Sequence, residues 1–301
     1  AYTPKLKYKF EMGLSNRDNG GVAPEVNNGP RFILDAFIQY NFYKNLSIKL
    51  GQGKLPGNRE RVISSGNLQF VDRSRVNSRF NIDRDFGISL LNHHKVSGDF
   101  IMKEIVSFSQ GEGRNVTAGN LGGGFDYTFR VEFLPMGNFK SKGDYSGSDL
   151  KREPKPKLAI GVTYDINDKA ARERGQNGSF IFDDLTGNYT GKTLQTIFVD
   201  AMFKYQGFSF MGEFADKQTS DDDPVVTDES GAKIGTFYTG SGLNLSAGFR
   251  YEQNQLKNPG YSYLEGVSLI DVLPSDEKEA SDLGLSATGK ESVSTGMESF
   301  N

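Results

Sequence analysis

The chain of 301 residues contains no cysteine and no tryptophan, and only two histidines. The lack of cysteine excludes disulfides, thiolate catalysis and cysteine-ligated metals. No apolar run approaches the roughly 18 residues that a transmembrane helix requires, so helical membrane spans are excluded as well. Acidic residues (38) outnumber basic residues (35), which argues against a nucleic-acid partner. The mean hydropathy of -0.51 is that of an ordinary soluble protein, but a β-barrel also has a low mean because only alternate residues face lipid.

What the sequence has is a period-two alternation of apolar and polar residues, repeated in segments of about nine to eleven residues. In the first segment, Leu6, Tyr8, Phe10 and Met12 alternate with Lys5, Lys7, Lys9 and Glu11. The same pattern recurs over 34–42, 46–50, 86–90, 125–133, 157–165, 197–205, 208–214 and 243–251. Segment 100–108 alternates less regularly because Glu104 falls among its apolar residues. The pattern predicts an all-β chain that forms a transmembrane antiparallel β-barrel in a bacterial outer membrane.

The lengths of the connections support this prediction, because such barrels have long loops on the extracellular side and short turns on the periplasmic side. The long connections are 14–30, 54–84, 110–124, 166–192 and 215–240, and the short ones are 43–45, 92–98 and 206–207. Segment 134–156 breaks the rule, being long where a short turn is expected. A soluble lectin-like β-sandwich is the alternative fold.

We expect a single barrel domain over residues 1–301, although the alternation decays into a poorly patterned segment at 252–301. An open sheet edge cannot face lipid, because its unpaired backbone groups cost several kcal/mol each. The barrel must therefore close with further strands. Either segment 252–301 contains them, or the chain lacks strands that the whole protein has.

The long connection 54–84 is rich in basic residues and is predicted to fold into the lumen as a constriction. Planar guanidinium groups suit oxyanions because they donate two parallel hydrogen bonds. Its candidate anion-binding residues are Lys54, Arg59, Arg61, Arg73, Arg75, Arg79 and Arg84, against Glu60, Asp72 and Asp83. Candidate residues of the lumen wall are Lys5, Lys7, Lys9, Lys49 and Arg130. The alternative for any single arginine is a structural ion pair with a neighbouring acid, which would only stiffen the loop.

Three other sequence features are interpreted as having no binding or catalytic role. His93 and His94 are expected in a short periplasmic turn, without an acidic partner for a metal site. The glycines of Leu121–Phe125 do not fit a nucleotide-binding motif. The acidic run at 221–223 lacks the spacing of a calcium loop and is interpreted as a solvated loop tip. We therefore expect no metal and no cofactor.

Several motifs together resemble one protein family. They are GQGKLPGNRE (51–60), NLQFVDRSRVNSRFNIDRDFGISL (67–90), GEGRN (111–115), FRVEFLPMG (129–137) and GFSFMGEF (207–214). In their order they look like the phosphate-selective porin O/P family, especially its Bacteroidetes members. The resemblance implies sixteen strands, a homotrimer, and an arginine-rich inward loop that guides anions such as phosphate, with Lys54 and Arg59 lining the pore. It also implies that Ala1 lies inside an early strand, with strands missing upstream. The C-terminal part departs from the family pattern, since Phe300 is penultimate in a polar run.

Two functions follow from this reading. The first is a porin for passive diffusion of small solutes, with a preference for anions, surrounded by outer-membrane lipid and lipopolysaccharide. The second is a barrel with a plugged lumen that acts as a structural or accessory subunit of an envelope assembly. An enzyme is not expected, because two adjacent histidines do not supply the usual arrangement of nucleophile and base.

Overall fold

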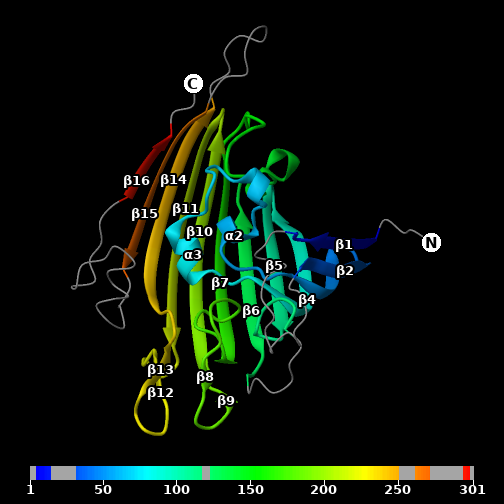
Figure 1. Cartoon of the computed structure of the whole chain (residues 1–301). Coiled ribbons are helices and arrows are strands. Elements are labelled where there is room, and N and C mark those ends of the chain that lie inside the picture. Colours follow the sequence, from blue (N-terminus) through cyan, green and yellow to red (C-terminus); the bar gives the residue numbers. More distant parts are fainter. Residues whose placement is uncertain (1–4, 15–31, 117–122, 251–261, 272–293, 299–301) are drawn as a thin grey trace.

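The computed structural model describes residues 5–14, 32–116 and 123–250, together with the backbone of 262–271 and 294–298. Twelve strands form one sheet, in which each strand pairs with its sequence neighbours and all the pairs are antiparallel (Figure 1). The strands are β1 (Leu6–Met12), β2 (Ile33–Tyr43), β3 (Leu46–Lys54), β4 (Arg84–Ser97), β5 (Phe100–Ser109), β6 (Asp126–Leu134), β7 (Lys157–Ala170), β10 (Lys192–Tyr205), β11 (Phe208–Thr219), β14 (Gly240–Arg250), β15 (Ser262–Asp271) and β16 (Ser294–Glu298). Among the described residues, β1 and β16 each have one partner strand, so the sheet has two edges.

The two faces of the sheet have the polarity expected of a barrel wall in lipid. On β10, Thr196 and Asp200 are buried on the inner face, whereas Ile197 and Val199 are more than 40% exposed on the outer face. A soluble protein buries its apolar face, so this inversion places lipid outside and a polar lumen inside. The predicted alternation is thereby confirmed, and the fold is that of an all-β outer-membrane barrel wall. None of the helices among the described residues is long and apolar enough to cross a membrane.

Short turns and long loops lie at opposite ends of the strands (Figure 1). Gln206-Gly207 joins β10 to β11, and both residues have a positive φ, which tight hairpin turns require. The long loops at the other end contain two small hairpins, β8 (Phe182–Asp183) with β9 (Asn188–Tyr189), and β12 (Val225–Thr227) with β13 (Lys233–Thr236). The short-turn end is the periplasmic end in barrels of this kind.

One sequence expectation about the turns is wrong. Residues 92–98 were predicted as a short turn, but β4 continues through them to Ser97, and Gly98-Asp99 makes the turn into β5. His93 and His94 are therefore strand residues, and His94 does have an acidic neighbour, because its Nδ1 lies 3.5 Å from Glu104. Polar residues near a strand end resemble a turn in sequence, although here they pair regularly with β5.

Segment 252–301 lies mostly outside the described residues. The backbone of β15 and β16 falls within it and extends the sheet beyond β14.

Candidate functional site

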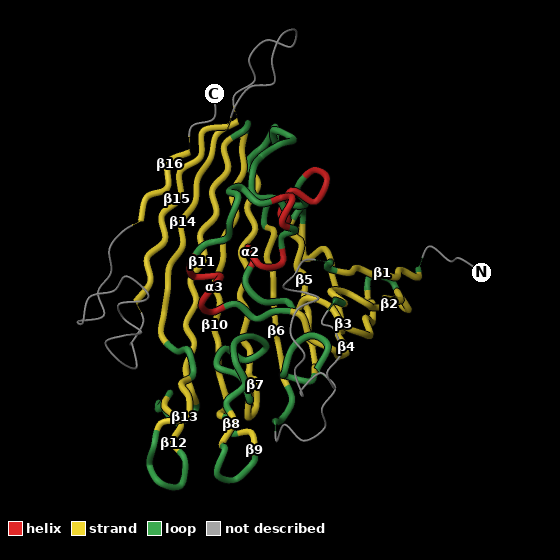
Figure 2. Tube along the Cα trace, viewed as in Figure 1, coloured by secondary structure: helices red, strands yellow, loops and turns green. Residues whose placement is uncertain are grey.

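The connection between β3 and β4 folds over the inner face of the sheet, as Figure 2 shows from the positions of its helices. It contains α2 (Arg59–Val62), η2 (Ser65–Asn67) and α3 (Arg75–Phe80). Ser74 caps α3 by accepting a hydrogen bond from the backbone N–H of Asn77. We call residues 55–83 the inward loop.

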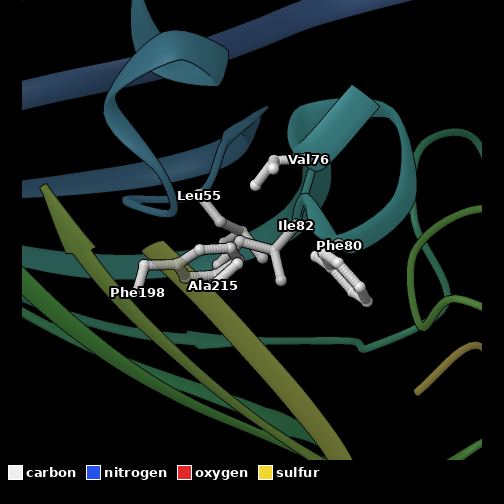
Figure 3. Close-up of a cluster of buried hydrophobic side chains, with 6 residues drawn as sticks. All are labelled: Leu55, Val76, Phe80, Ile82, Phe198 and Ala215. Atoms are coloured by element: carbon white, nitrogen blue, oxygen red, sulfur yellow. The ribbon is translucent and has the colours of Figure 1, made fainter. Parts of the chain in front are cut away.

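Apolar side chains attach the inward loop to the far wall of the sheet. Leu55, Val76, Phe80 and Ile82 pack against Phe198 of β10 and Ala215 of β11 (Figure 3). A Cβ on Gly242 of β14 would lie 3.0 Å from side-chain atoms of both Phe80 and Val76, so the glycine leaves room for α3. The polar inner wall is thus interrupted by a small apolar contact area, formed by Phe198 and Ala215, where the loop docks.

Arg59 fixes the loop to the wall by charge. Its side chain is completely buried; Nε donates to Asp200 at 2.6 Å, and Nη2 lies 3.4 Å from Glu132. Arg130 of β6 binds the same two carboxylates and also donates to the carbonyl oxygen of Gly57 at 3.0 Å. Two arginines thereby neutralise two acids, and Lys103 of β5 adds a third cation 3.4 Å from Glu132. Arg59 does not line the cavity described below, in contrast to its predicted pore-lining position, and Arg130 contributes to it only from within this paired cluster.

A second segment reaches into the lumen from the short-turn end. Residues 135–156 contain η3 (Lys140–Tyr145), and this inward fold accounts for the unexpected length of the connection. Tyr145 donates its hydroxyl to Glu132 at 3.0 Å, while Lys103 of β5 binds the Asp144 carboxylate at 2.5 Å. Lys204 of β10 donates to three backbone carbonyl oxygens of the segment, at 2.7 to 2.8 Å. The segment is therefore held by residues of three wall strands, β5, β6 and β10.

Between the inward loop and strands β1 to β4 remains a cavity of about 540 Å³. Seven basic and two acidic side chains line it. The basic ones are Lys9, Lys49, Lys54, Arg61, Arg73, Arg84 and Arg130, and the acidic ones are Glu11 and Asp35. Phe37, Tyr145, Ser64 and Ser65 add aromatic and hydroxyl surface. We call this space the basic cavity.

Some of these basic groups are paired with acids. Asp35 accepts hydrogen bonds from both Lys9 and Arg84, the latter at 2.7 Å. Arg61 is paired with Asp83 at the edge of the inward loop. Burial alone would raise the pKa of Asp83, but the charge and hydrogen bonds of Arg61 hold that pKa below its ordinary value. These pairs neutralise part of the charge of the basic cavity.

Three basic groups that line the basic cavity form no ion pair with an acid of the described residues. Lys49 and Lys54 donate to backbone carbonyl oxygens, Lys49 to that of Lys54 at 3.2 Å and Lys54 to that of Arg61 at 2.7 Å. Arg73 likewise donates to the carbonyls of Glu60 and Ile63, at 3.1 and 2.9 Å. Burial and the neighbouring Arg61 lower the pKa of Arg73, a sign of crowded positive charge. Carbonyl bonds orient these cations without neutralising them.

The remaining predicted residues lie away from the basic cavity. Arg75 is exposed on α3, and Arg79 stacks on the ring of Tyr238, 3.5 Å from its centroid. Lys5 and Lys7 are exposed and do not line the cavity. The sequence did indicate that inner positions of strands carry polar groups, and Asp200 and Lys103 occupy such positions. Nothing in the sequence, however, indicated that they would receive Arg59 and Asp144.

The chain is similar to known porins in both structure and sequence. Among solved structures, the chain resembles the one titled "High pH structure of Pseudomonas putida OprB", with 12% sequence identity and a TM-score of 0.49 over 93% of this chain and 67% of that one. No curated protein sequence matches it significantly. The family model described as "Phosphate-selective porin O and P" matches residues 2–214, well over half of the 301 residues. The chain therefore belongs to the phosphate-selective porin O and P family and is a porin of the bacterial outer membrane.

Proposed function

We propose that the chain forms a diffusion pore that prefers small anions such as phosphate, with the basic cavity as its selective region. The observation that carries this proposal is the excess of seven basic over two acidic side chains around one space. Basic groups inside a low-dielectric wall focus a positive potential, which concentrates anions and repels cations. Lys54 and Arg73 donate to backbone carbonyl oxygens and form no ion pair among the described residues, and a phosphate oxygen can bind to such cationic donors.

The second candidate function is a structural or accessory subunit with a closed lumen. It is favoured by the two inward segments, 55–83 and 135–156, which together bury the inner faces of β6, β7, β10 and β11. The two functions differ in whether ions pass along the basic cavity. If the chain is a pore, the two inward segments fill one half of the lumen, and ions pass through the half that contains the basic cavity.

Single-channel recording of the whole protein in planar bilayers separates the two candidates. Under a potassium chloride gradient, an anion pore gives a reversal potential of the sign set by chloride, and added phosphate reduces the chloride current. Replacing Lys49, Lys54 and Arg73 together with glutamine should reduce this anion preference. The matched control is Arg75→Gln, which removes an exposed guanidinium of the same loop outside the basic cavity.

Each outcome decides the proposal. Folded protein that gives no conductance overturns the pore and favours the structural subunit. A conductance without ion preference, or a triple variant with the same reversal potential as the Arg75→Gln control, removes the basic cavity from the mechanism.

A further inference from the structure

Near the long-loop end of the sheet, β6 and β7 carry two carboxyl groups that face each other on the inner wall. Asp126 and Asp165 are 0% and 1% exposed, and their carboxyl groups are close enough to share a hydrogen bond. Neither forms an ion pair within the described part of the chain. Lys217 of β11 attracts Asp165, but its ammonium group donates to the carbonyl oxygen of Arg174 at 3.1 Å. As carboxylates, the two groups repel each other in a buried position, which is costly without a counter-ion.

Three further buried oxygen atoms around this pair have no hydrogen-bond partner among the described residues. They are Oδ1 of Asn167, Oε1 of Gln176 and Oγ1 of Thr196, and their residues are 0–2% exposed. Asn167 lies directly opposite Asp126 in the register of β6 and β7, and Thr196 of β10 lies opposite Asp165. Side chains opposite each other on one face of a sheet have Cβ atoms about 4.5–5.5 Å apart. The amide of Gln176 contacts the pair directly, since its Nε2 donates to Asp126 at 2.7 Å.

The amide groups use their nitrogens elsewhere and leave their oxygens unmatched. Nδ2 of Asn167 donates to the carbonyl oxygen of Gly111 at 2.7 Å, as Nε2 of Gln176 donates to Asp126. Asp85 of β4 adds its negative charge to the potential at Asp126. Acceptors and negative charge are therefore in excess here. We call the residues that supply the acceptors the oxygen cluster, which consists of Asp126, Asp165, Asn167, Gln176 and Thr196.

We propose that the oxygen cluster binds a calcium ion. Calcium takes about six to eight oxygen ligands in flexible geometry, including carboxylates and the side-chain carbonyls of Asn and Gln, whereas magnesium requires a near-ideal octahedron. No group of three or more acids or histidines suited to a metal ion occurs among the described residues, so the amide oxygens are essential to this site. A proton shared by Asp126 and Asp165 would relieve their repulsion but would leave the three other oxygens unmatched.

A calcium ion at this place fastens an outer loop to the barrel wall. Gln176 belongs to the long connection between β7 and β10, whereas the other four ligands belong to β6, β7 and β10. The long-loop end faces the external medium in barrels of this kind, so calcium reaches the cluster from outside. This differs from the expectation of no metal, because ligands spread over three strands and a loop leave no motif in the sequence. No residue of the cluster lines the basic cavity, so the site is separate from the proposed anion preference.

Titration calorimetry with calcium chloride tests the site on the whole protein, purified in detergent and freed of lipopolysaccharide. We expect one calcium ion per chain, and magnesium should bind at least about tenfold more weakly. Asp126→Asn and Asp165→Asn should each raise the dissociation constant for calcium about tenfold or more. Asp223→Asn, in the exposed acidic run 221–223, is the matched control and should leave it unchanged. Absence of calcium binding, equal affinity for the two ions, or loss of binding in the control alone overturns the proposal.

Thermal unfolding distinguishes a bound ion from a shared proton. With a chelator present, Asp126→Asn removes the repulsion within the pair and should melt at a higher temperature than the unchanged chain. With calcium present the order should reverse, because the ion stabilises only the chain that binds it tightly. Should the two carboxyl groups share a proton instead, calcium will change neither melting temperature, and that result overturns the proposal. The unchanged chain tests the site by itself even where a variant fails to fold, since calcium must raise its melting temperature.

Discussion

At the scale of single residues, the ion pairs of the lumen are packed so closely that a neighbouring side chain would displace them. A Cβ on Gly161 of β7 would lie 2.3 Å from the Arg130 guanidinium and 2.7 Å from the Asp200 carboxylate. Only glycine at this position lets Arg130 reach across β7 to β10. The cluster therefore depends on a residue without a side chain as much as on the charged ones.

Within this cluster, replacing Arg59 should lower the free energy of unfolding the most. Arg59, Arg130 and Lys103 together balance the carboxylates of Glu132, Asp200 and Asp144. Arg59→Met removes one of these three cations and leaves an excess of buried negative charge. We expect a decrease of about 3–5 kcal/mol in the free energy of unfolding, measured by denaturant titration in lipid vesicles. Arg75→Met is the control with an exposed guanidinium. Adding Asp200→Asn to Arg59→Met should recover part of the loss, and no recovery would contradict the electrostatic explanation.

Glu112 should make stability depend on pH. It follows β5 in a long loop, where burial raises the pKa of its carboxyl to about 7, against the lowering effects of the Ala171 backbone N–H and of Arg172. Since this pKa is raised on folding, the stabilisation is complete below about pH 4.5 and is lost as the pH rises through about 7. The change should be on the order of 1–3 kcal/mol in unfolding free energy between pH 5 and 8. Glu112→Gln should flatten this dependence, whereas Glu229→Gln in an exposed tip should not.

At the scale of elements, the sheet was predictable and the inward segments were only partly so. Strands are local in their pattern, because most residues of β10 show by their polarity which face they occupy, as Thr196 and Asp200 do on the inner face and Ile197 and Val199 on the outer face. The docking of the inward loop is not local. In the sequence Phe80 is an ordinary apolar residue, and its packing depends on the apolar Phe198 and Ala215 on the inner faces of β10 and β11. Segment 135–156 has no periodicity, so its length was visible in the sequence but its destination was not.

The apolar contact between α3 and the wall can be tested by truncating the Phe80 side chain. Phe80→Ala removes a completely buried ring and should weaken the docking of the inward loop by about 3–5 kcal/mol. A loosened loop moves into and out of the conduction path, so single-channel recordings should show added current noise and weaker ion selectivity. Val71→Ala changes a side chain of the same loop that is 75% exposed and serves as control. Quiet, unchanged currents in Phe80→Ala would mean that the ion pairs of Arg59 hold the loop without help.

At the scale of the whole molecule, charge is divided between two halves of the lumen. Around β6 and β10, acids and bases neutralise one another beneath the inward segments, whereas along β1 to β4 the basic cavity keeps an excess of positive charge. The formal net charge of -3 gives no hint of this division. Selectivity in such a pore comes from the placement of charge, and the sequence reveals placement only where strand register is known.

This division predicts how selectivity depends on salt. If the basic cavity acts through its field, anion preference should weaken as the Debye length shrinks from about 30 Å at 0.01 M to about 3 Å at 1 M. Reversal potentials should therefore be larger across a gradient of about 0.01 to 0.1 M than across one of about 0.1 to 1 M at the same ratio. The variant lacking Lys49, Lys54 and Arg73 should lose most of this difference. Anion preference that stays constant with salt would instead mean that solutes are selected by direct hydrogen bonds to donors such as Lys54 and Arg73, because contacts at that range are screened little.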